Sequence, residues 1–216
     1  MKTEYIKRYV FFLIGLFIMS VGVAFSIKAD LGTSPISSVP YVLSLIVPIS
    51  VGRLTIAMHC VFILLQILIL RKDYQLIQLM QLPVAVIFGL MIDFSVYLVR
   101  DLQYSSYCMQ WFFCMTGIIL VAVGVSMEVT ANAVTLAGEG LVLAICKLLP
   151  VKFSSLKMCF DCILVIIAAL ISVLMKGELL GIREGTIAAA VLVGFLSKPI
   201  CLPMKKMMDQ WIDISN

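Results

Sequence analysis

Two polar segments, rich in glycine and in hydroxyl or acidic side chains, interrupt an otherwise apolar sequence. The first runs from Lys28 to Pro40 and the second from Thr130 to Gly140. A short apolar stretch follows each, which is typical of a half-helix or a re-entrant hairpin. Free N–H groups and the dipole at such a helix start attract anions. We therefore expect these segments to bind a small, anionic solute. The candidate binding residues are Asp30, Gly32, Thr33, Ser34, Pro35, Gly138, Glu139 and Gly140.

The alternative for both segments is an amphipathic helix that lies flat among the lipid headgroups. The first segment reads as a helix start, because Ser34 suits the N-cap and Pro35 the first helical position. In the second, glycines allow backbone or ligand to approach closely. The nearly continuous apolar stretch behind each polar front favours the re-entrant interpretation.

Other ionisable side chains occur within or beside the apolar stretches, where a charge is costly and therefore marks a functional candidate. Asp161 follows Lys157 by one helical turn, so the lysine would keep the acid ionised near the cytoplasmic interface, and a buried, pH-sensitive acid is the alternative. His59, the only histidine, fits either a coupling role or a core histidine with one hydrogen bond, and the latter is favoured. The candidates for coupling or charge selectivity are Lys157, Asp161, Arg183, Glu184, Thr186 and His59.

Catalytic and metal-binding patterns are missing from the sequence. There is no nucleophile–base motif and no phosphate-cradling loop. Cys159 and Cys162 have metal-ligand spacing, but no second pair or histidine cluster completes a site, so they are interpreted as core cysteines. We expect no enzyme activity, no cofactor, no bound metal and no nucleic-acid partner.

The elements that must position these residues are membrane spans. Hydrophobic residues make up 62% of the 216 residues and charged residues only 13%, too few charges to coat a soluble globule. The apolar runs are long enough to cross a bilayer as helices, and they do not alternate as in a barrel. We predict an all-α, polytopic protein with about six transmembrane helices. The expected spans are 10–27, 54–70, 79–99, 109–127, 158–174 and 185–202.

Charge distribution orients the predicted spans. With a cytoplasmic N-terminus, most lysines and arginines fall on the cytoplasmic side, as the positive-inside rule requires. Both termini are then cytoplasmic, and we expect a multi-pass protein of the bacterial inner membrane with lipid as its surroundings. A cleaved signal peptide is the alternative for the first span, but its apolar run is too long.

An internal repeat divides the chain into two halves. An offset of 102 residues aligns Val21-Gly22-Val23 with Val123-Gly124-Val125, and Thr33 with Thr135. Phe88-Gly89 and Val193-Gly194 also correspond after a small gap. We predict one membrane domain with a first repeat at 1–100, a second at 101–203 and an interfacial tail at 204–216. The broken segments lie near 30–48 and 131–149. Because each repeat has three spans, the second must be inverted, an architecture recurrent in secondary transporters.

Several short motifs occur in a recognisable order: Ala29–Ser44, Gln78–Pro83, Phe88-Gly89 with Asp93, Gly138–Gly140 and Arg183–Thr186. Together they resemble the YczE/YyaS/YitT-like family of bacterial membrane proteins over nearly the whole chain. The resemblance implies a multi-span cytoplasmic-membrane protein, usually described as uncharacterised or transporter-like, and supplies no substrate. Asp161 resembles the family's acid in a Lys-x-x-x-Asp stretch. Two positions depart from the family pattern, Ala137 in place of proline and His59 in place of asparagine.

Two functions follow from these features. The leading one is a small transporter whose site lies between the two repeats, with acids such as Glu139 setting charge selectivity. The alternative is a membrane-embedded accessory or regulatory protein that acts through a partner. A substrate-capture subunit of a vitamin-uptake system has a similar length, but Gly15 and Gly22 are sparse for its docking motif. Substrate, coupling ion and oligomeric state stay open, with a homodimer among the open assemblies.

Overall fold

The computed structural model describes residues 2–213, with side chains for 4–211. Within these residues every element is helical and no strand occurs. The elements are α1 (Lys2–Ala29), α2 (Pro35–Ile46), α3 (Val51–Leu70), η1 (Arg71–Asp73), η2 (Leu76–Met80), α4 (Gln81–Leu98), α5 (Tyr107–Ala131), α6 (Ala137–Leu148), α7 (Phe153–Lys176) and α8 (Glu184–Asp213).

Six helical segments in the described chain are long and apolar enough to cross a membrane, which confirms the predicted fold class. They are α1, α3 with η1, η2 with α4, α5, α7 and α8. The helices α2 and α6 have only 12 residues each. A 12-residue helix is about 18 Å long, well short of the roughly 30 Å hydrocarbon layer.

The last helix is longer than the sequence indicates. We expected the sixth span to end near Leu202, but α8 continues to Asp213 through Pro199 and Pro203. The predicted interfacial tail is therefore a continuation of this helix as far as the structure describes it, and residues 214–216 lie outside the described residues. Prolines are tolerated within transmembrane helices, where neighbouring groups satisfy the freed backbone.

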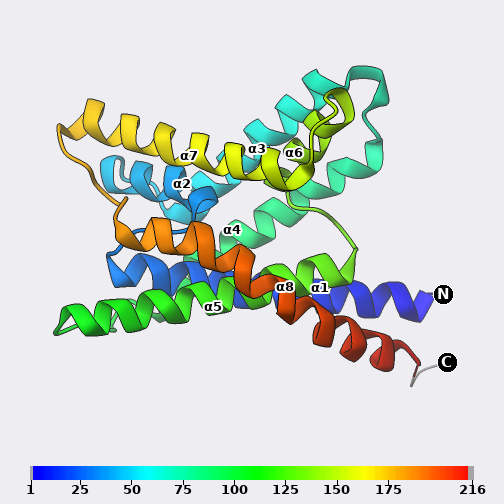
Figure 1. Cartoon of the computed structure of the whole chain (residues 1–216), viewed down its shortest axis with the longest axis horizontal. Helices are drawn as coiled ribbons and strands as arrows, with labels where there is room; N and C mark the ends of the chain where they lie inside the picture. The colour runs from blue at the N-terminus through cyan, green and yellow to red at the C-terminus, as the bar shows by residue number, and fades with distance from the viewer. Residues whose placement is uncertain (1, 214–216) are drawn as a thin grey trace.

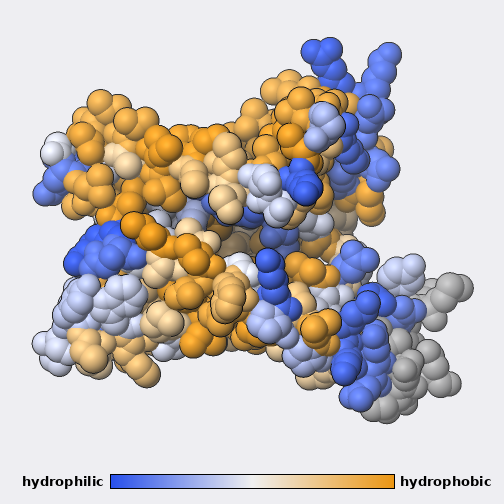
Figure 2. Space-filling model, viewed as in Figure 1, coloured by the Kyte–Doolittle hydropathy of each residue, from blue (hydrophilic) through white to orange (hydrophobic). Residues whose placement is uncertain are grey.

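The long helices run roughly side by side between two ends of the molecule (Figure 1). One end, here called the N-terminal face, carries the start of α1 and the end of α5, where Arg8 donates a hydrogen bond to the Ala131 carbonyl. The other, here called the distal face, carries the end of α1 and the start of α8, where Arg183 donates to the Asp30 carbonyl at 2.9 Å. Hydrophilic residues gather at these two ends, and apolar side chains cover the middle (Figure 2).

Glycines bring α1 and α5 together along the middle of the molecule. A Cβ atom added to Gly124 would lie 2.6 Å from the Gly15 carbonyl oxygen, and one added to Gly22 would lie 2.8 Å from the Gly117 oxygen. Such distances leave no room for any side chain. The two helices therefore form a close-packed pair, against which α4 packs on the α1 side and α8 on the α5 side.

Each of the two short helices begins inside the molecule and runs outward. A linker runs from the end of α1 or α5 toward the middle, and α2 or α6 then runs back outward (Figure 1). Ala137 at the start of α6 is fully buried, whereas Leu148 at its end is 61% exposed. The two starts meet, because a Cβ added to Gly138 would lie 2.5 Å from Ile36 Cδ1. Each short helix packs against a long helix of the other half, α2 against α7 and α6 against α3.

Candidate functional site

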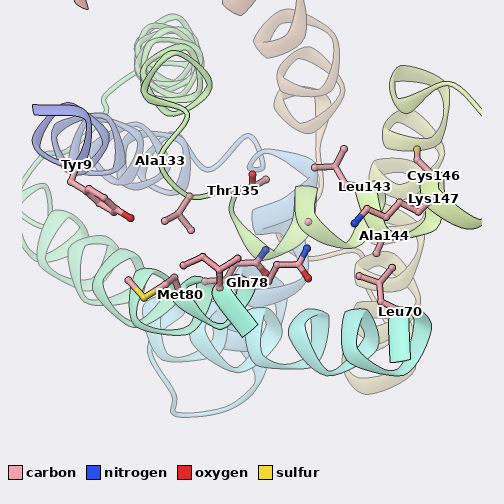
Figure 3. A pocket seen from close by; sticks show the side chains of 14 residues that line it. Tyr9, Leu70, Gln78, Met80, Ala133, Thr135, Leu143, Ala144, Cys146 and Lys147 are labelled. Atoms are coloured by element: carbon pink, nitrogen blue, oxygen red, sulfur yellow. The ribbon is translucent and has the colours of Figure 1, made fainter. Parts of the chain in front are cut away.

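A cavity of about 450 Å³ opens along α6, from Gly140 to Lys147. Helices and linkers from both halves of the chain line it (Figure 3). Among the side chains that the structure describes, its wall contains no carboxylate and one cation. The lining residues are Tyr9, Leu70, Ile77, Gln78, Met80, Gln81, Ala133, Val134, Thr135, Gly140, Leu143, Ala144, Cys146 and Lys147.

Two polar groups stand at opposite ends of the cavity. The Lys147 ammonium points inward from the last turn of α6, and the Tyr9 hydroxyl points inward from α1 (Figure 3). Gln78 contributes a buried Oε1 atom that has no hydrogen-bond partner. An ammonium and a phenol can both donate hydrogen bonds to an anionic group, and charge-assisted bonds of this kind are strong. The remaining wall is largely apolar, so the cavity suits an organic anion with an apolar body.

Two glutamine side chains fix the start of α6 beneath the cavity. Gln66 Nε2 donates to Gln81 Oε1 at 2.9 Å and to the Ala137 carbonyl at 3.0 Å. Both amides pack against Gly140, where an added Cβ would lie 2.6 Å from Gln81 Nε2. Gly140 thus allows α6 to sit directly on a buried polar pair contributed by α3 and α4.

A buried acid holds the linker that leads into α6. Glu128, in the last turn of α5, is 4% exposed, and its Oε1 accepts a hydrogen bond from the Leu136 N–H at 3.0 Å. Leu136 is the N-cap residue of α6 and offers no side-chain cap. The carboxylate therefore fixes the linker 132–136 in the conformation that directs α6 inward.

The first polar segment lies on the distal side and does not line the cavity. Asp30 is exposed and accepts a hydrogen bond from Tyr104 Oη at 3.3 Å. Gly32 and Thr33 are buried, and Thr33 Oγ1 has no partner. Ser34 occupies the predicted N-cap position but caps no N–H group, and Pro35 begins α2 as expected.

The predicted charged cluster at the start of α8 closes over this segment. Arg183 and Glu184 form an exposed ion pair at 3.3 Å, and Glu184 also accepts from Tyr107 Oη. Thr186 is 1% exposed, and its Oγ1 has no hydrogen-bond partner. A Cβ added to Gly32 would lie 2.2 Å from that oxygen. The structure therefore brings Asp30, Gly32, Arg183 and Thr186 together.

The second polar segment meets the predicted acid of α7. Gly138 lies against α2, Gly140 lines the cavity, and Glu139 between them is half-buried in the first turn of α6. Lys157 and Asp161 form the predicted i,i+4 ion pair at 2.5 Å. Both are charged neighbours of Glu139, so these three ionisable candidates share one region.

His59 stands apart from both groups. It is 2% exposed and packs against the rings of Phe62 and Phe88. Its Nδ1 atom has no hydrogen-bond partner. The apolar contacts of this environment are those of a core histidine.

Sequence reasoning missed the residues that shape the cavity most directly. Lys147 looks like one of many cytoplasmic-side cations, and Tyr9 like an interfacial aromatic residue. The signal that could have found Gln66 was present, because it is a polar side chain within an apolar span. Glu128 was visible as an acid beside the second segment, but only the fold shows that it binds the linker.

Comparison with known proteins gives a family without an assigned activity. A profile described as a family of unknown function (DUF6198) matches residues 6–201. The chain is also similar to the uncharacterized protein YyaS of Bacillus subtilis (strain 168), with 26% identity over 121 residues. That match covers 56% of this chain and 59% of YyaS, so less than two thirds of the relative is covered. No solved structure matches.

Proposed function

The chain belongs to the DUF6198 family of unknown function, and we propose that it is a transporter of a small organic anion in the bacterial inner membrane. The family match and the likeness to YyaS confirm the resemblance to uncharacterised YyaS-like proteins. The observation that carries the proposal is the meeting of two half-helices, at Gly138 and Ile36, beside a cavity at the boundary of the two halves. Discontinuous helices that meet inside the protein are a recurrent way to build a transport site.

The pairing of helices supports an inverted repeat as part of this proposal. Under the 102-residue offset, Gly15 corresponds to Gly117 and Gly22 to Gly124. The contacts join Gly15 with Gly124 and Gly22 with Gly117, which is the reciprocal pattern that a two-fold axis produces. The pairs α2–α7 and α6–α3 are related by the same exchange.

The charge of the cavity supports an anionic solute. Among the described residues, Lys147 is the only charged residue that lines the cavity. The N-terminal face, where the cavity lies, is the cytoplasmic side in our proposal because most cations fall there. A solute taken from the cytoplasm would therefore enter this cavity first, and a solute released into the cytoplasm would leave from it.

Ligand binding and uptake test the function together. We expect at least one member of a panel of radiolabelled organic acids, covering carboxylates, sulfonates and phosphate esters, to accumulate in proteoliposomes that contain the purified protein. The same compound should raise the melting temperature in a saturable way, because a ligand that binds only the folded state stabilises it. Absence of both effects for every compound would refute transport of organic anions and favour the accessory-protein alternative.

The variant Lys147→Ala tests the site within this function. We expect the affinity for the active compound to fall about tenfold, equivalent to roughly 1.4 kcal/mol, because a charge-assisted contact is lost. Lys72→Ala is the matched control, since Lys72 is an exposed lysine in η1 that does not line the cavity. Dissociation constants from thermal-shift titrations measure both. Equal constants for the two variants would show that the cavity is not where the anion binds.

A further inference from the structure

The two halves differ where α3 and α4 meet. A Cβ added to Gly52 near the start of α3 would lie 2.0 Å from the Gly89 carbonyl oxygen of α4, so the two backbones touch. The carboxylate of Asp93 joins the two helices by two hydrogen bonds, here called the latch. Its Oδ1 accepts from the Gly52 N–H at 2.8 Å, and its Oδ2 accepts from Ser50 Oγ at 2.7 Å. The α4 carboxylate thus binds the free N–H end of α3, where a negative charge is stabilising.

The corresponding helices of the second half are apart. The helices α7 and α8 share no packed interface in the described chain, and they diverge toward the N-terminal face (Figure 1). Gly194, the counterpart of Gly89, has no atom within 4 Å of the position that a Cβ would take. A second pair, Gln81 and Thr186, is separated by the same number of residues as Gly89 and Gly194, which supports this alignment. Gln81 packs against Gly140 and Thr186 against Gly32, so each lies beside one polar segment.

We infer that the α3–α4 contact is a closed gate on the distal face, that the α7–α8 gap is the matching open gate on the N-terminal face, and that the protein exchanges them. This inference rests on the proposed transport function. Two halves of similar sequence and helix pairing have access to similar conformations. The state in which α7 and α8 close while α3 and α4 part is therefore the second state, and a site exposed alternately to the two faces is what a transporter requires.

The latch exists in only one half, which explains why this conformation is the resting one. Lys198 stands in α8 where Asp93 stands in α4, and Ser154 stands in α7 where Gly52 stands in α3. The start of α7 has no side-chain cap. Closure of α7 on α8 would bring an ammonium group to the positive end of a helix, and the Ser154 side chain would limit the approach.

Hydrogen–deuterium exchange of the full chain in lipid nanodiscs tests the gate without any solute. Asp93→Asn weakens the latch, so the amides at Gly52 and Arg53 should exchange at least tenfold faster than in the unmodified protein. Asp101→Asn is the matched control, because Asp101 is an exposed acid that pairs with Arg100 on the same face and does not contact α3. Equal exchange at the start of α3 in both variants would overturn the role of Asp93.

A gain-of-latch variant tests the exchange of gates independently of any loss of stability. Ser154→Gly with Lys198→Asp gives α7 and α8 the residues of the closed pair. We expect at least tenfold slower exchange at residues 154–156 together with faster exchange at the start of α3. Lys205→Asp is the charge-matched control farther along α8. Unchanged exchange at both sites would refute the second state. A protein with shifted exchange but no uptake of any organic acid would keep the gates and lose the proposed transport function.

Discussion

Gly52→Ala is expected to lower the melting temperature of the purified protein by about 5 °C, whereas Gly194→Ala leaves it unchanged or raises it slightly. The first change places a methyl group 2.0 Å from the Gly89 oxygen and 2.6 Å from the Asp93 carboxyl carbon. Overpacking of this kind costs roughly 1–3 kcal/mol, and each kcal/mol corresponds to about 2–4 °C in a chain of this size. The Gly89 oxygen is a backbone atom and cannot move away by a change of rotamer. The helices α3 and α4 must therefore separate.

The control at Gly194 has the same chemistry in an open environment. No atom lies within 4 Å of its added Cβ, and alanine is favoured over glycine in a helix by about 1 kcal/mol. Melting temperatures from tryptophan fluorescence in detergent, compared with those of the unmodified protein, measure both variants. A similar loss of stability in the two variants would mean that the close contact between α3 and α4 does not exist in solution.

Gly32→Ala is the second change for which we expect a large loss of stability. Gly32 has φ of 96°, where a residue with a side chain is strained, and such strain costs of order 1–3 kcal/mol. The added methyl group would also lie 2.2 Å from Thr186 Oγ1 and 2.9 Å from the Arg183 nitrogen. Strain and collision act together at this position, so the melting temperature should fall further than after Gly52→Ala.

Gly177→Ala separates strain from collision. Gly177 ends α7 with φ of 75°, and no atom lies within 4 Å of its added Cβ. It therefore carries the conformational cost alone. Thr186→Ala should restore part of the stability of Gly32→Ala and none of that of Gly177→Ala, because it removes the oxygen that collides. If Gly32→Ala and Gly177→Ala were equally destabilising, the packing of α8 on the first polar segment would be disproved.

Much of the fold could be predicted because the membrane restricts the choice. An apolar run of sufficient length can only be a helix in lipid, and the runs at 10–27 and 109–127 became α1 and α5. The starts of α2 and α6 were also predictable, since Pro35 and Gly138 mark positions where a helix begins or where backbones meet. The length of α8 was not, because Pro199 ends most soluble helices and only neighbouring groups decide whether it ends this one.

The cavity could not be predicted because its wall is assembled from distant parts of the chain. Lys147, Tyr9 and Gln81 belong to three helices, and no spacing in the sequence relates them. Sequence reasoning chose residues from both polar segments, but only Gly140 among those candidates lines the cavity. The difference arises because the first polar segment lies on the distal side whereas the cavity lies along α6, and a repeat in sequence does not state on which side a cavity forms.

Each short helix packs against a long helix of the other half, and this arrangement has a consequence for how the chain is synthesised. α2 leaves the ribosome more than a hundred residues before α7, the helix that it packs against. Until α7 and the start of α8 are made, α2 and the polar linker ahead of it lack the helices that cover them, and unsatisfied backbone in lipid is costly. The first half must therefore wait at the membrane surface or within the insertion machinery, and the native structure can form only after most of the second half has emerged.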